Sequence, residues 1–345
     1  MDAFFLFTSN HSNYNIELSR INNPCISLAF TFMLIDTGLI FLSLALLYYG
    51  GDFLVTGSIN ISQRFKISPF FIGAVIIGFG TSAPEFAVSI MASLQGSGDL
   101  ALANVVGSNI TNVGLVLGAT ALMAPLTIEP RQFNKETPAL IISTIIICVF
   151  AWNNYLSRLE GFIMLILLFI YLLKSFKSNE YISDNIEEEP YLIDTKRPAF
   201  QIILIISGMV ILIIGANLIV QGATNIARYI GISEWFIGVS IVALGTSLPE
   251  IVSSVIAAKR GHGDMAIGNV FGSNIFNILM VIGVASSIHP LTINEYIHAD
   301  LIYTTVLTCL LLFLIRIRHN IKKRDGIILI LCYAAYIGLK ALNLL

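Results

Sequence analysis

The stretch FIGAVIIGFGTSAPEFAVSIMASLQGSGDLALANVVGSNITN, residues 71–112, returns as FIGVSIVALGTSLPEIVSSVIAAKRGHGDMAIGNVFGSNIFN, residues 236–277. The offset is 165 positions throughout, no gap is needed, and close to half of the positions are identical. Both copies interrupt apolar sequence with glycine, proline and polar side chains, which is not the composition of a lipid-facing helix. Such segments at matching places in two halves are the sequence feature that best indicates the binding site of a transporter.

The composition is that of a polytopic, all-α membrane protein. Of 345 residues, 56% are hydrophobic and 12% are charged, which is about half the charged share of a soluble domain. The apolar runs are long and continuous, whereas a transmembrane β-barrel would show short alternating segments. No basic patch indicates a nucleic-acid partner, and the four scattered cysteines do not form a metal-binding or redox spacing.

Hydropathy predicts ten transmembrane helices. Their expected ranges are 34–63, 68–94, 99–123, 137–153, 158–176, 198–228, 233–258, 264–288, 298–317 and 325–343. The first and sixth helices align at the same offset as the quoted segments, because Gly50 and Gly57 fall on Gly215 and Gly222. The repeat unit is therefore expected to be five helices.

The distribution of positive charge predicts the orientation. Of the 19 Lys and Arg residues, 15 follow the odd-numbered helices, which places those loops in the cytoplasm and both termini outside. Since each unit has an odd number of helices, the two units must have inverted topology. The turn Gly96–Asp99 is then expected to face out, and its copy Gly261–Asp264 to face in. Inverted repeats are the usual scaffold of alternating access.

The chain divides into four expected parts: an N-terminal extension (1–33), a first five-helix repeat (34–177), an acidic cytoplasmic linker (178–197) and a second five-helix repeat (198–345). The extension is a poor signal peptide, so either Met33 is the native start or residues 1–32 form a weakly ordered extension. We interpret the linker as a solvated tether rather than a regulatory cation site.

Glu85 and Glu250 lie in the middle of apolar helices, at equivalent positions of the two copies. A carboxylate at membrane depth is costly unless it is paired, solvated or bound to a cation, so a functional role is the default interpretation. The alternative is a protonated side chain that hydrogen-bonds two helices. Two glutamates at equivalent positions, each with the same polar neighbours in the sequence, favour a functional role over this structural one.

The residues around each glutamate add oxygen atoms. Pro84 and Pro249 remove a backbone donor, so carbonyls near Gly78 and Ala243 are expected to be free and to line a polar cavity. The hydroxyls of this segment belong to Thr81, Ser82, Thr246 and Ser247. On the following helix, Ser108 and Asn112 share one face, as do Ser273 and Asn277 in the second copy.

Every atom in this constellation that is expected to bind a cation is an oxygen. Such sites suit hard cations, and about six oxygens around two carboxylates suit Ca²⁺. An anionic substrate is disfavoured, because only helix dipoles would meet its charge. The glycine spacing is not interpreted as a nucleotide-binding loop, because no βαβ unit surrounds it.

The GTSAPE and GTSLPE motifs, followed by GSNITN and GSNIFN, closely resemble the α-repeats of the sodium/calcium exchanger branch of the calcium/cation antiporters. The resemblance covers residues 33–345. It implies ten helices in two inverted repeats, and Ca²⁺ coordination by Glu85 and Glu250 with Thr81 and Thr246. It also implies that Na⁺ sites involve the side chains of Ser82, Ser247, Ser108 and Ser273 and the backbone near Gly78 and Ala243.

One departure from the family pattern concerns the coupling ion. Many sodium/calcium exchangers carry Asp where this chain has Asn277, and here Asn112 and Asn277 give asparagine in both halves. We therefore expect a Na⁺/Ca²⁺ antiporter, with H⁺/Ca²⁺ exchange as the alternative and a cation channel as a distant one. The expected setting is the inner (plasma) membrane of a prokaryote, with Na⁺ and Ca²⁺ as substrates, no cofactor, no enzymatic activity and no obligate protein partner.

Overall fold

The computed structural model describes residues 24–178, 197–232, 241, 243–293 and 297–342, without the side chains of residues 24–32, 178 and 243. Nearly all of these residues are helical, and η marks a short π- or 3₁₀-helical segment. The elements of the first half are α2 (Pro24–Phe65), α3 (Pro69–Ile72), η1 (Gly73–Ile77), α4 (Gly78–Thr81), α5 (Ala83–Leu94), α6 (Gly98–Thr111), η2 (Asn112–Val116), α7 (Leu117–Met123), β1 (Leu126–Thr127), α8 (Pro130–Phe150), η3 (Ala151–Asn153), β2 (Tyr155–Leu156) and α9 (Arg158–Ser178).

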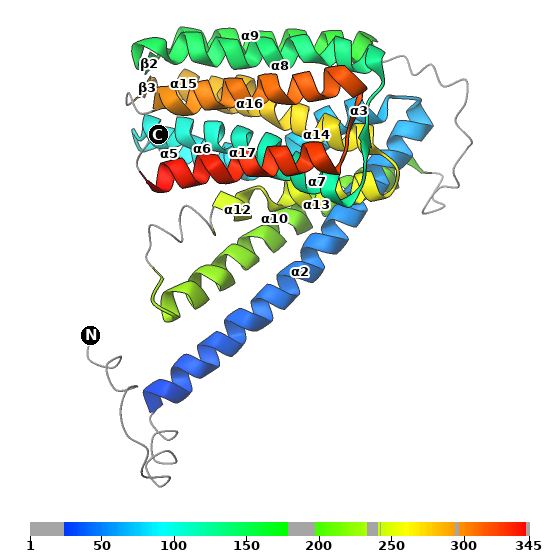
Figure 1. Cartoon of the computed structure of the whole chain (residues 1–345). Helices are drawn as coiled ribbons and strands as arrows, with labels where there is room; N and C mark the ends of the chain where they lie inside the picture. The colour runs from blue at the N-terminus through cyan, green and yellow to red at the C-terminus, as the bar shows by residue number, and fades with distance from the viewer. Residues whose placement is uncertain (1–23, 179–196, 233–240, 242, 294–296, 343–345) are drawn as a thin grey trace.

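The second half follows the same order. Its elements are α10 (Pro198–Tyr229), α12 (Ala243–Thr246), α13 (Leu248–Lys259), α14 (Gly263–Phe276), η5 (Asn277–Ile282), α15 (Gly283–Ile288), β3 (Leu291–Thr292), α16 (Ile297–Arg318), β4 (Asn320–Ile321) and α17 (Lys323–Ala341). In Figure 1, α2 and α10 run obliquely beside a bundle made by the other long helices.

Seven helices among the described residues are long and apolar enough to cross a membrane, and an eighth span results if α3–α4 and α5 are counted as one bent span. The ten predicted spans are therefore matched in part. The seventh predicted helix begins outside the described residues, and α17 carries charges at Lys323, Arg324 and Asp325 in its first turn. The structure thus has the helical class that the sequence predicts.

Two helices begin at least seven residues earlier than predicted. The first was expected from residue 34 and begins at Pro24, and the fourth was expected from residue 137 and begins at Pro130. Hydropathy marks the apolar part of a helix, whereas the helix itself can extend through polar residues. Proline at the first helical position costs no hydrogen bond, because that N–H would be unpaired in any case.

Two short antiparallel sheets lie at opposite ends of α8. β1 pairs with β4, with Leu126 opposite Ile321, and β2 pairs with β3, with Leu156 opposite Leu291. The 21 residues of α8 separate the sheets by about 30 Å. An offset of 165 residues converts either pairing into the other, so each sheet joins one half of the chain to the other.

The turns that precede α6 and α14 lie at opposite ends of the bundle. A Cβ atom on Gly98 would lie 2.6 Å from the carbonyl oxygen of Thr292 in β3. A Cβ atom on Gly263 would lie 3.0 Å from the Cα atom of Leu126 in β1. These equivalent glycines therefore pack against different sheets.

α2 and α10 form an antiparallel pair with equivalent contacts near its two ends. The side-chain amide of Asn60 donates to Gln201 Oε1 at 2.9 Å. At the equivalent place, the amide of Asn225 donates to Asp36 Oδ1, also at 2.9 Å. In the middle, a Cβ atom on Gly208 would lie 2.7 Å from the carbonyl oxygen of Gly50, so small residues allow the two backbones to approach closely.

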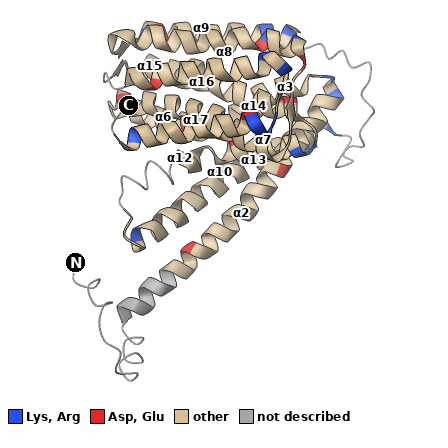
Figure 2. Cartoon of the chain, in the orientation of Figure 1, with Lys and Arg blue, Asp and Glu red and all other residues tan. Residues whose placement is uncertain are grey.

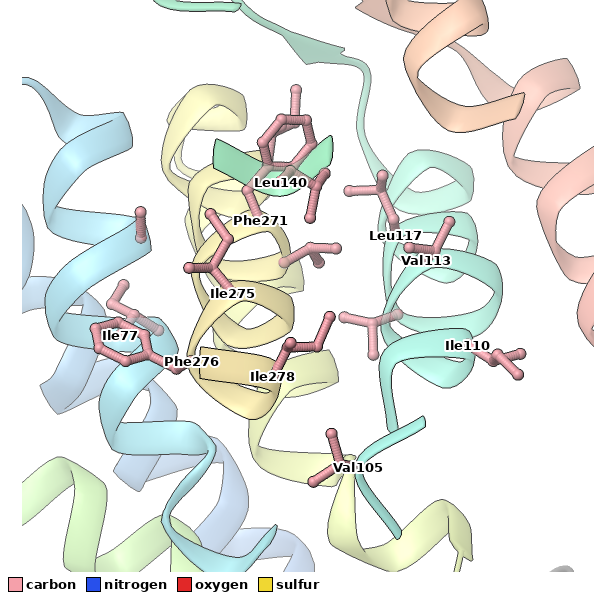
Figure 3. Packing of buried hydrophobic residues seen from close by; sticks show 14 of the residues in the cluster. Ile77, Val105, Ile110, Val113, Leu117, Leu140, Phe271, Ile275, Phe276 and Ile278 are labelled. Carbon is pink, nitrogen blue, oxygen red and sulfur yellow. The ribbon is translucent and has the colours of Figure 1, made fainter. Parts of the chain in front are cut away.

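The centre of the bundle is a close crossing between α3–η1–α4 and α14. Cβ atoms on Gly268 and Gly272 would clash with the carbonyl oxygens of Phe70 and Ala74, respectively. Next to this crossing, Figure 3 shows apolar side chains of η1, α6–α7 and α14–η5 gathered in one core. Those drawn include Ile77, Ile110, Val113, Leu117, Phe271, Ile275, Phe276 and Ile278, and all of these side chains are buried.

Charged side chains lie mainly at the ends of the helices. Figure 2 shows most of the Lys and Arg residues at the end of the bundle where α9 and α16 finish, and few at the other end. The middle of the bundle is largely without charge in this view. This distribution is typical of a membrane protein with one cytoplasmic face.

Candidate cation site

A break in the second helix places Glu85 at the start of α5. α4 ends at Thr81, α5 begins at Ala83, and the two parts of the helix are bent by 46°. Because Pro84 has no N–H, the carbonyl of Gly80 lacks the donor that a regular helix would supply. The second copy has the same break, with α12 ending at Thr246 and α13 beginning at Leu248.

One carbonyl that the sequence predicted to be free is hydrogen-bonded. The carbonyl of Gly78 was expected to be free, but it accepts the backbone N–H of Ser82 at 3.2 Å. It also accepts the hydroxyl of Ser273 from α14 at 3.3 Å. A short helical turn therefore continues from η1 to Thr81 and is fixed from across the crossing, and the chain leaves the helix only at Ser82.

The two glutamates are buried and only partly hydrogen-bonded. Glu85 and Glu250 are each 1% exposed. Glu85 Oε1 accepts the hydroxyl of Ser108 at 3.4 Å, whereas its Oε2 and both carboxyl oxygens of Glu250 have no hydrogen-bond partner. The two carboxyl groups are close enough to interact electrostatically. Buried oxygens without partners are costly, so their presence indicates a site for a ligand that supplies positive charge.

The backbone of each glutamate is held by an asparagine of the following helix. Asn104 donates its amide to the carbonyl oxygen of Glu85 at 3.2 Å and to Ser89 Oγ at 2.9 Å. Asn269 donates to the carbonyl oxygen of Glu250 at 3.5 Å and to Ser254 Oγ at 2.8 Å. These bonds join α5 to α6 and α13 to α14 in equivalent ways.

Four asparagines form a symmetric cluster between α6–η2 and α14–η5. Asn112 donates its amide to Asn274 Oδ1 at 3.1 Å, and Asn277 donates to Asn109 Oδ1 at 3.0 Å. These two bonds are equivalent under the 165-residue offset. They fix the orientation of both amides and leave Oδ1 of Asn112 and of Asn277 buried without a hydrogen-bond partner.

The hydroxyl groups at the two helix breaks add further oxygen atoms to the candidate site. Thr81 donates to the carbonyl oxygen of Ile77 at 3.0 Å and lies 3.3 Å from Asn269 Oδ1. The hydroxyl oxygens of Ser82 and Ser247 are buried without a partner. Thr246 is half-buried at the end of α12.

The chemistry of these atoms suits a hard cation. Two carboxylates lie among neutral amide and hydroxyl oxygens, and within the described ranges three His, Cys, Asp or Glu side chains nowhere meet in a metal-binding group. Carboxylate, amide, hydroxyl and carbonyl oxygens are ligands for Ca²⁺ and Na⁺ rather than for softer metals. The arrangement can therefore bind a cation by electrostatics and oxygen coordination.

The residues that the sequence predicted for this site fall into three bonded sets. Ser108, Glu85, Glu250 and Thr81 are joined by hydrogen bonds or electrostatic contact, the last two through Asn269. Ser273 is bonded to Gly78 across the crossing, and Asn112 and Asn277 are bonded to Asn274 and Asn109. Ala243 begins α12, and its side chain is outside the description. The sequence analysis did not assign a role to Asn109 or Asn274, although the repeated GSNI motif contains both.

Comparison with known proteins identifies the family. The sequence profile described as "Sodium/calcium exchanger protein" matches residues 35–177 and again residues 200–342. The sodium/calcium exchanger MaX1 of Methanosarcina acetivorans is 31% identical over 340 residues, covering 87% of this chain and 96% of MaX1. The inner membrane protein YrbG of Escherichia coli is 32% identical over 264 residues, covering 75% of this chain and 81% of YrbG.

The fold has a solved counterpart. The structure of the sodium-calcium exchanger NCX_Mj, soaked with 2.5 mM Na⁺ and 10 mM Sr²⁺, matches with a TM-score of 0.77 and 33% sequence identity. The match covers 89% of this chain and 99% of that one. The chain belongs to the sodium/calcium exchanger family, which confirms the resemblance seen in the motifs. It is an integral membrane cation antiporter rather than an enzyme.

Proposed function

We propose that this member of the sodium/calcium exchanger family exchanges Na⁺ for Ca²⁺ by alternating access, with Glu85 and Glu250 as the central cation ligands. The observation that carries the proposal is the pair of buried, equivalent carboxylates, three of whose four oxygens have no hydrogen-bond partner. A shared site explains antiport, because the same carboxylates cannot hold Ca²⁺ and Na⁺ at once. The names of the relatives MaX1 and NCX_Mj support this choice of ions.

The neutral oxygens would divide between the ions. We assign Thr81 and Thr246 to Ca²⁺ together with the glutamates. We assign to Na⁺ the hydroxyls of Ser82, Ser247, Ser108 and Ser273 and the backbone near Ala243. The carbonyl of Gly78 is left out of this assignment, because it already accepts hydrogen bonds from Ser82 and Ser273. Asn112 and Asn277 would offer their unpartnered Oδ1 atoms to either ion.

The proposed architecture is ten transmembrane helices in two inverted five-helix repeats, residues 34–177 and 198–345. Three observations support it. The family profile matches once in each half, the two small sheets exchange under the 165-residue offset, and the turns at Gly98 and Gly263 pack at opposite ends of the bundle.

The proposed location is a prokaryotic inner membrane, with both termini outside and the 178–197 linker in the cytoplasm. Lys and Arg residues gather at the end of the bundle where α9 finishes and the linker begins (Figure 2), and cytoplasmic faces carry such an excess. The relative YrbG is an inner membrane protein.

The test is uptake of ⁴⁵Ca²⁺ by proteoliposomes loaded with Na⁺, compared with vesicles loaded with K⁺ or held under a pH gradient. We expect uptake only with the outward Na⁺ gradient. The variant Glu250→Gln should reduce the rate by at least about 100-fold, because the amide cannot supply the charge that balances Ca²⁺. Uptake driven only by the pH gradient would show H⁺/Ca²⁺ exchange instead.

Glu136→Gln is the matched control. Glu136 is also buried, at 2% exposed, but it lies on α8, where its Oε1 accepts the hydroxyl of Ser175 at 2.9 Å. A glutamine oxygen can accept the same bond, so this variant should transport close to the normal rate. Near-normal exchange by Glu250→Gln, or equal loss in both variants, would contradict the assignment of the site.

A further inference from the structure

The turn that joins α16 to α17 carries five basic residues within nine positions. They are five of the 19 Lys and Arg residues of the chain, and no other stretch of nine residues in the sequence holds more than two. All five side chains are exposed, and they belong to Arg316, Arg318, Lys322, Lys323 and Arg324. The turn lies at the end of the bundle where Lys and Arg residues gather (Figure 2). It is therefore the densest group of positive charges in the chain.

The protein compensates little of this charge. Arg316 donates to a neutral acceptor, Asn134 Oδ1, at 2.8 Å. Arg318 Nη1 lies 4.0 Å from Asp325 Oδ1, and the other four basic side chains form no ion pair with the described residues. Asp325 is buried, and its Oδ2 accepts the backbone N–H of Lys322 at 2.9 Å, so this carboxylate also holds the turn itself.

The equivalent turn of the first half shows that the backbone does not need these charges. Under the 165-residue offset, Asn154 falls on His319, and both residues have positive φ, at 62° and 49°. Each turn carries a two-residue strand that pairs with the other half of the chain. Yet the residues equivalent to the five basic ones include one basic side chain: Ala151, Asn153, Ser157, Arg158 and Leu159. The folding of the turn therefore does not explain the five charges.

Exposed apolar side chains lie next to the basic ones. On α16, Phe313 and Ile317 are 61% and 58% exposed and flank Arg316. On α17, Ile327 and Ile328 are also exposed, and they follow Arg324 by three and four residues, which places them one turn away on the same helix face. In membrane-spanning helices such apolar side chains contact acyl chains, and basic side chains at the helix ends reach the headgroups.

We propose that this turn binds the headgroup of an anionic phospholipid. The basic side chains would contact the phosphate, and the neighbouring apolar side chains would contact the acyl chains. A free phosphate ion would use only the charges, whereas an anionic lipid matches both parts of the surface. The cytoplasmic leaflet, which the proposed orientation places at this end, is negatively charged, and each Lys or Arg near such a surface strengthens binding about fivefold. The proposal holds whichever ions the central site exchanges.

The first test is native mass spectrometry of the detergent-purified protein, titrated with phosphatidylglycerol or with phosphatidylcholine. We expect tighter binding of phosphatidylglycerol. The triple variant Lys322→Gln, Lys323→Gln, Arg324→Gln should weaken its binding by at least about tenfold and leave phosphatidylcholine unaffected.

A second triple variant is the matched control. Lys66→Gln, Lys174→Gln, Lys177→Gln removes the same charge from other exposed residues, and it should change the binding of phosphatidylglycerol by less than about twofold. Equal affinity of the unsubstituted protein for the two lipids would overturn the proposal. Equal losses in both triple variants would also overturn it, because the attraction would then belong to the overall charge.

A local measurement shows where the lipid binds. The chain has two tryptophans, Trp152 and Trp235, so Phe313→Trp combined with Trp152→Phe and Trp235→Phe places a single fluorophore beside the basic turn. In phosphatidylcholine vesicles, brominated phosphatidylglycerol should quench it more than the same fraction of brominated phosphatidylcholine. The Lys322, Lys323 and Arg324 substitutions should abolish this difference.

Trp152 itself is the control for position. It is 76% exposed on the equivalent turn of the first half, and in Trp235→Phe the two brominated lipids should quench it equally. Preferential quenching by phosphatidylglycerol at both positions, or at neither, would overturn a local site. Release of the lipid by millimolar inorganic phosphate would assign the turn to free phosphate and would likewise overturn the proposal.

Discussion

Asn104 and Asn269 occupy equivalent positions, yet the second holds more of the buried polar network. Asn104 donates to the backbone of Glu85 and to Ser89. Asn269 donates to Glu250 and to two serines, and it also lies 3.3 Å from the hydroxyl of Thr81, which belongs to the other half of the chain. Asn269 therefore joins the two glutamate segments, whereas Asn104 holds one.

This difference predicts unequal losses of stability. Asn269→Ala should lower the free energy of unfolding by about 1–3 kcal/mol, because it leaves buried hydroxyl and carbonyl groups without partners. Asn104→Ala should cost less, since Asn104 is only half-buried. The measurement is the thermal midpoint of each purified variant in detergent, followed by fluorescence-detected size-exclusion chromatography. A lower midpoint for Asn104→Ala than for Asn269→Ala would contradict the argument.

At this scale the sequence indicated most of the candidate site, and the repeat is the reason. A single buried Glu has a structural explanation, whereas Glu85 and Glu250 in matching GTS-x-PE contexts pointed to one shared function. The orientation of Asn112 and Asn277 was not predictable, because it depends on bonds to Asn274 and Asn109 across the interface between the halves. Such contacts between distant segments leave no local pattern in the sequence.

Among the elements, the crossing of η1 and α4 with α14 fixes the geometry of the site. A Cβ atom on Gly272 would clash with the carbonyl oxygen of Ala74, and one on Gly78 would lie 2.8 Å from the backbone nitrogen of Ser273. The same approach lets the hydroxyl of Ser273 reach the carbonyl of Gly78. Backbone contact of this kind cannot be relieved by turning a side chain.

We therefore expect Gly272→Ala to destabilise the protein by about 1–3 kcal/mol, as overpacking does, and to reduce transport by separating the two segments. Gly338→Ala on α17 is the matched control, because a Cβ atom there would meet nothing within 4 Å. In a helix, alanine in place of glycine should stabilise by up to about 1 kcal/mol. Thermal midpoints and the yield of monodisperse protein compare the two variants, and a Gly272→Ala protein as stable as Gly338→Ala would refute the close crossing.

Some features of the helices and strands were predictable from the sequence, and others were not. The helices and the break before Pro84 follow from hydropathy and from the chemistry of proline. The carbonyl of Gly78 is not free as expected, because it accepts hydrogen bonds from Ser82 and from Ser273 of the other half. The two-residue strands were not predicted, because a pair such as Leu126–Thr127 has no periodicity to detect. Its pairing with β4 depends on the arrangement of the whole bundle.

Across the whole molecule, the two halves are equivalent in sequence but not in contacts. α2 covers α13, since a Cβ atom on Gly51 would clash with the side chains of Val252 and Ile256. The equivalent residues of α5, Ala87 and Met91, are exposed. Under the proposed alternating access, a structure in which only one of two equivalent faces is covered corresponds to one of the two states. Here the covered face is at the end where Lys and Arg residues gather (Figure 2).

An ion pair reinforces the covered end. Arg260 pairs with Asp52 of α2 and donates to Thr56 Oγ1 at 2.7 Å. At the other end the equivalent residues are Gln95 and Asn217, which carry no charge. The pair therefore favours closure at the Lys- and Arg-rich end over closure at the opposite end, and two repeats of similar sequence acquire an unequal equilibrium between the two states.

Arg260→Gln should consequently shift the population toward the state that is open at this end. Ion pairs whose side chains are partly exposed, here 25% and 30%, contribute about 0.2–1 kcal/mol, which corresponds to a shift of up to about fivefold. The measurement is the rate at which a membrane-impermeant maleimide labels a cysteine introduced at Val252, applied from the Lys- and Arg-rich side of oriented vesicles. Labelling should become faster in Arg260→Gln and return toward the original rate when Arg260→Asp is combined with Asp52→Arg, because the exchanged charges restore the attraction. Equal labelling rates in all three proteins would show that the ion pair does not bias the two states.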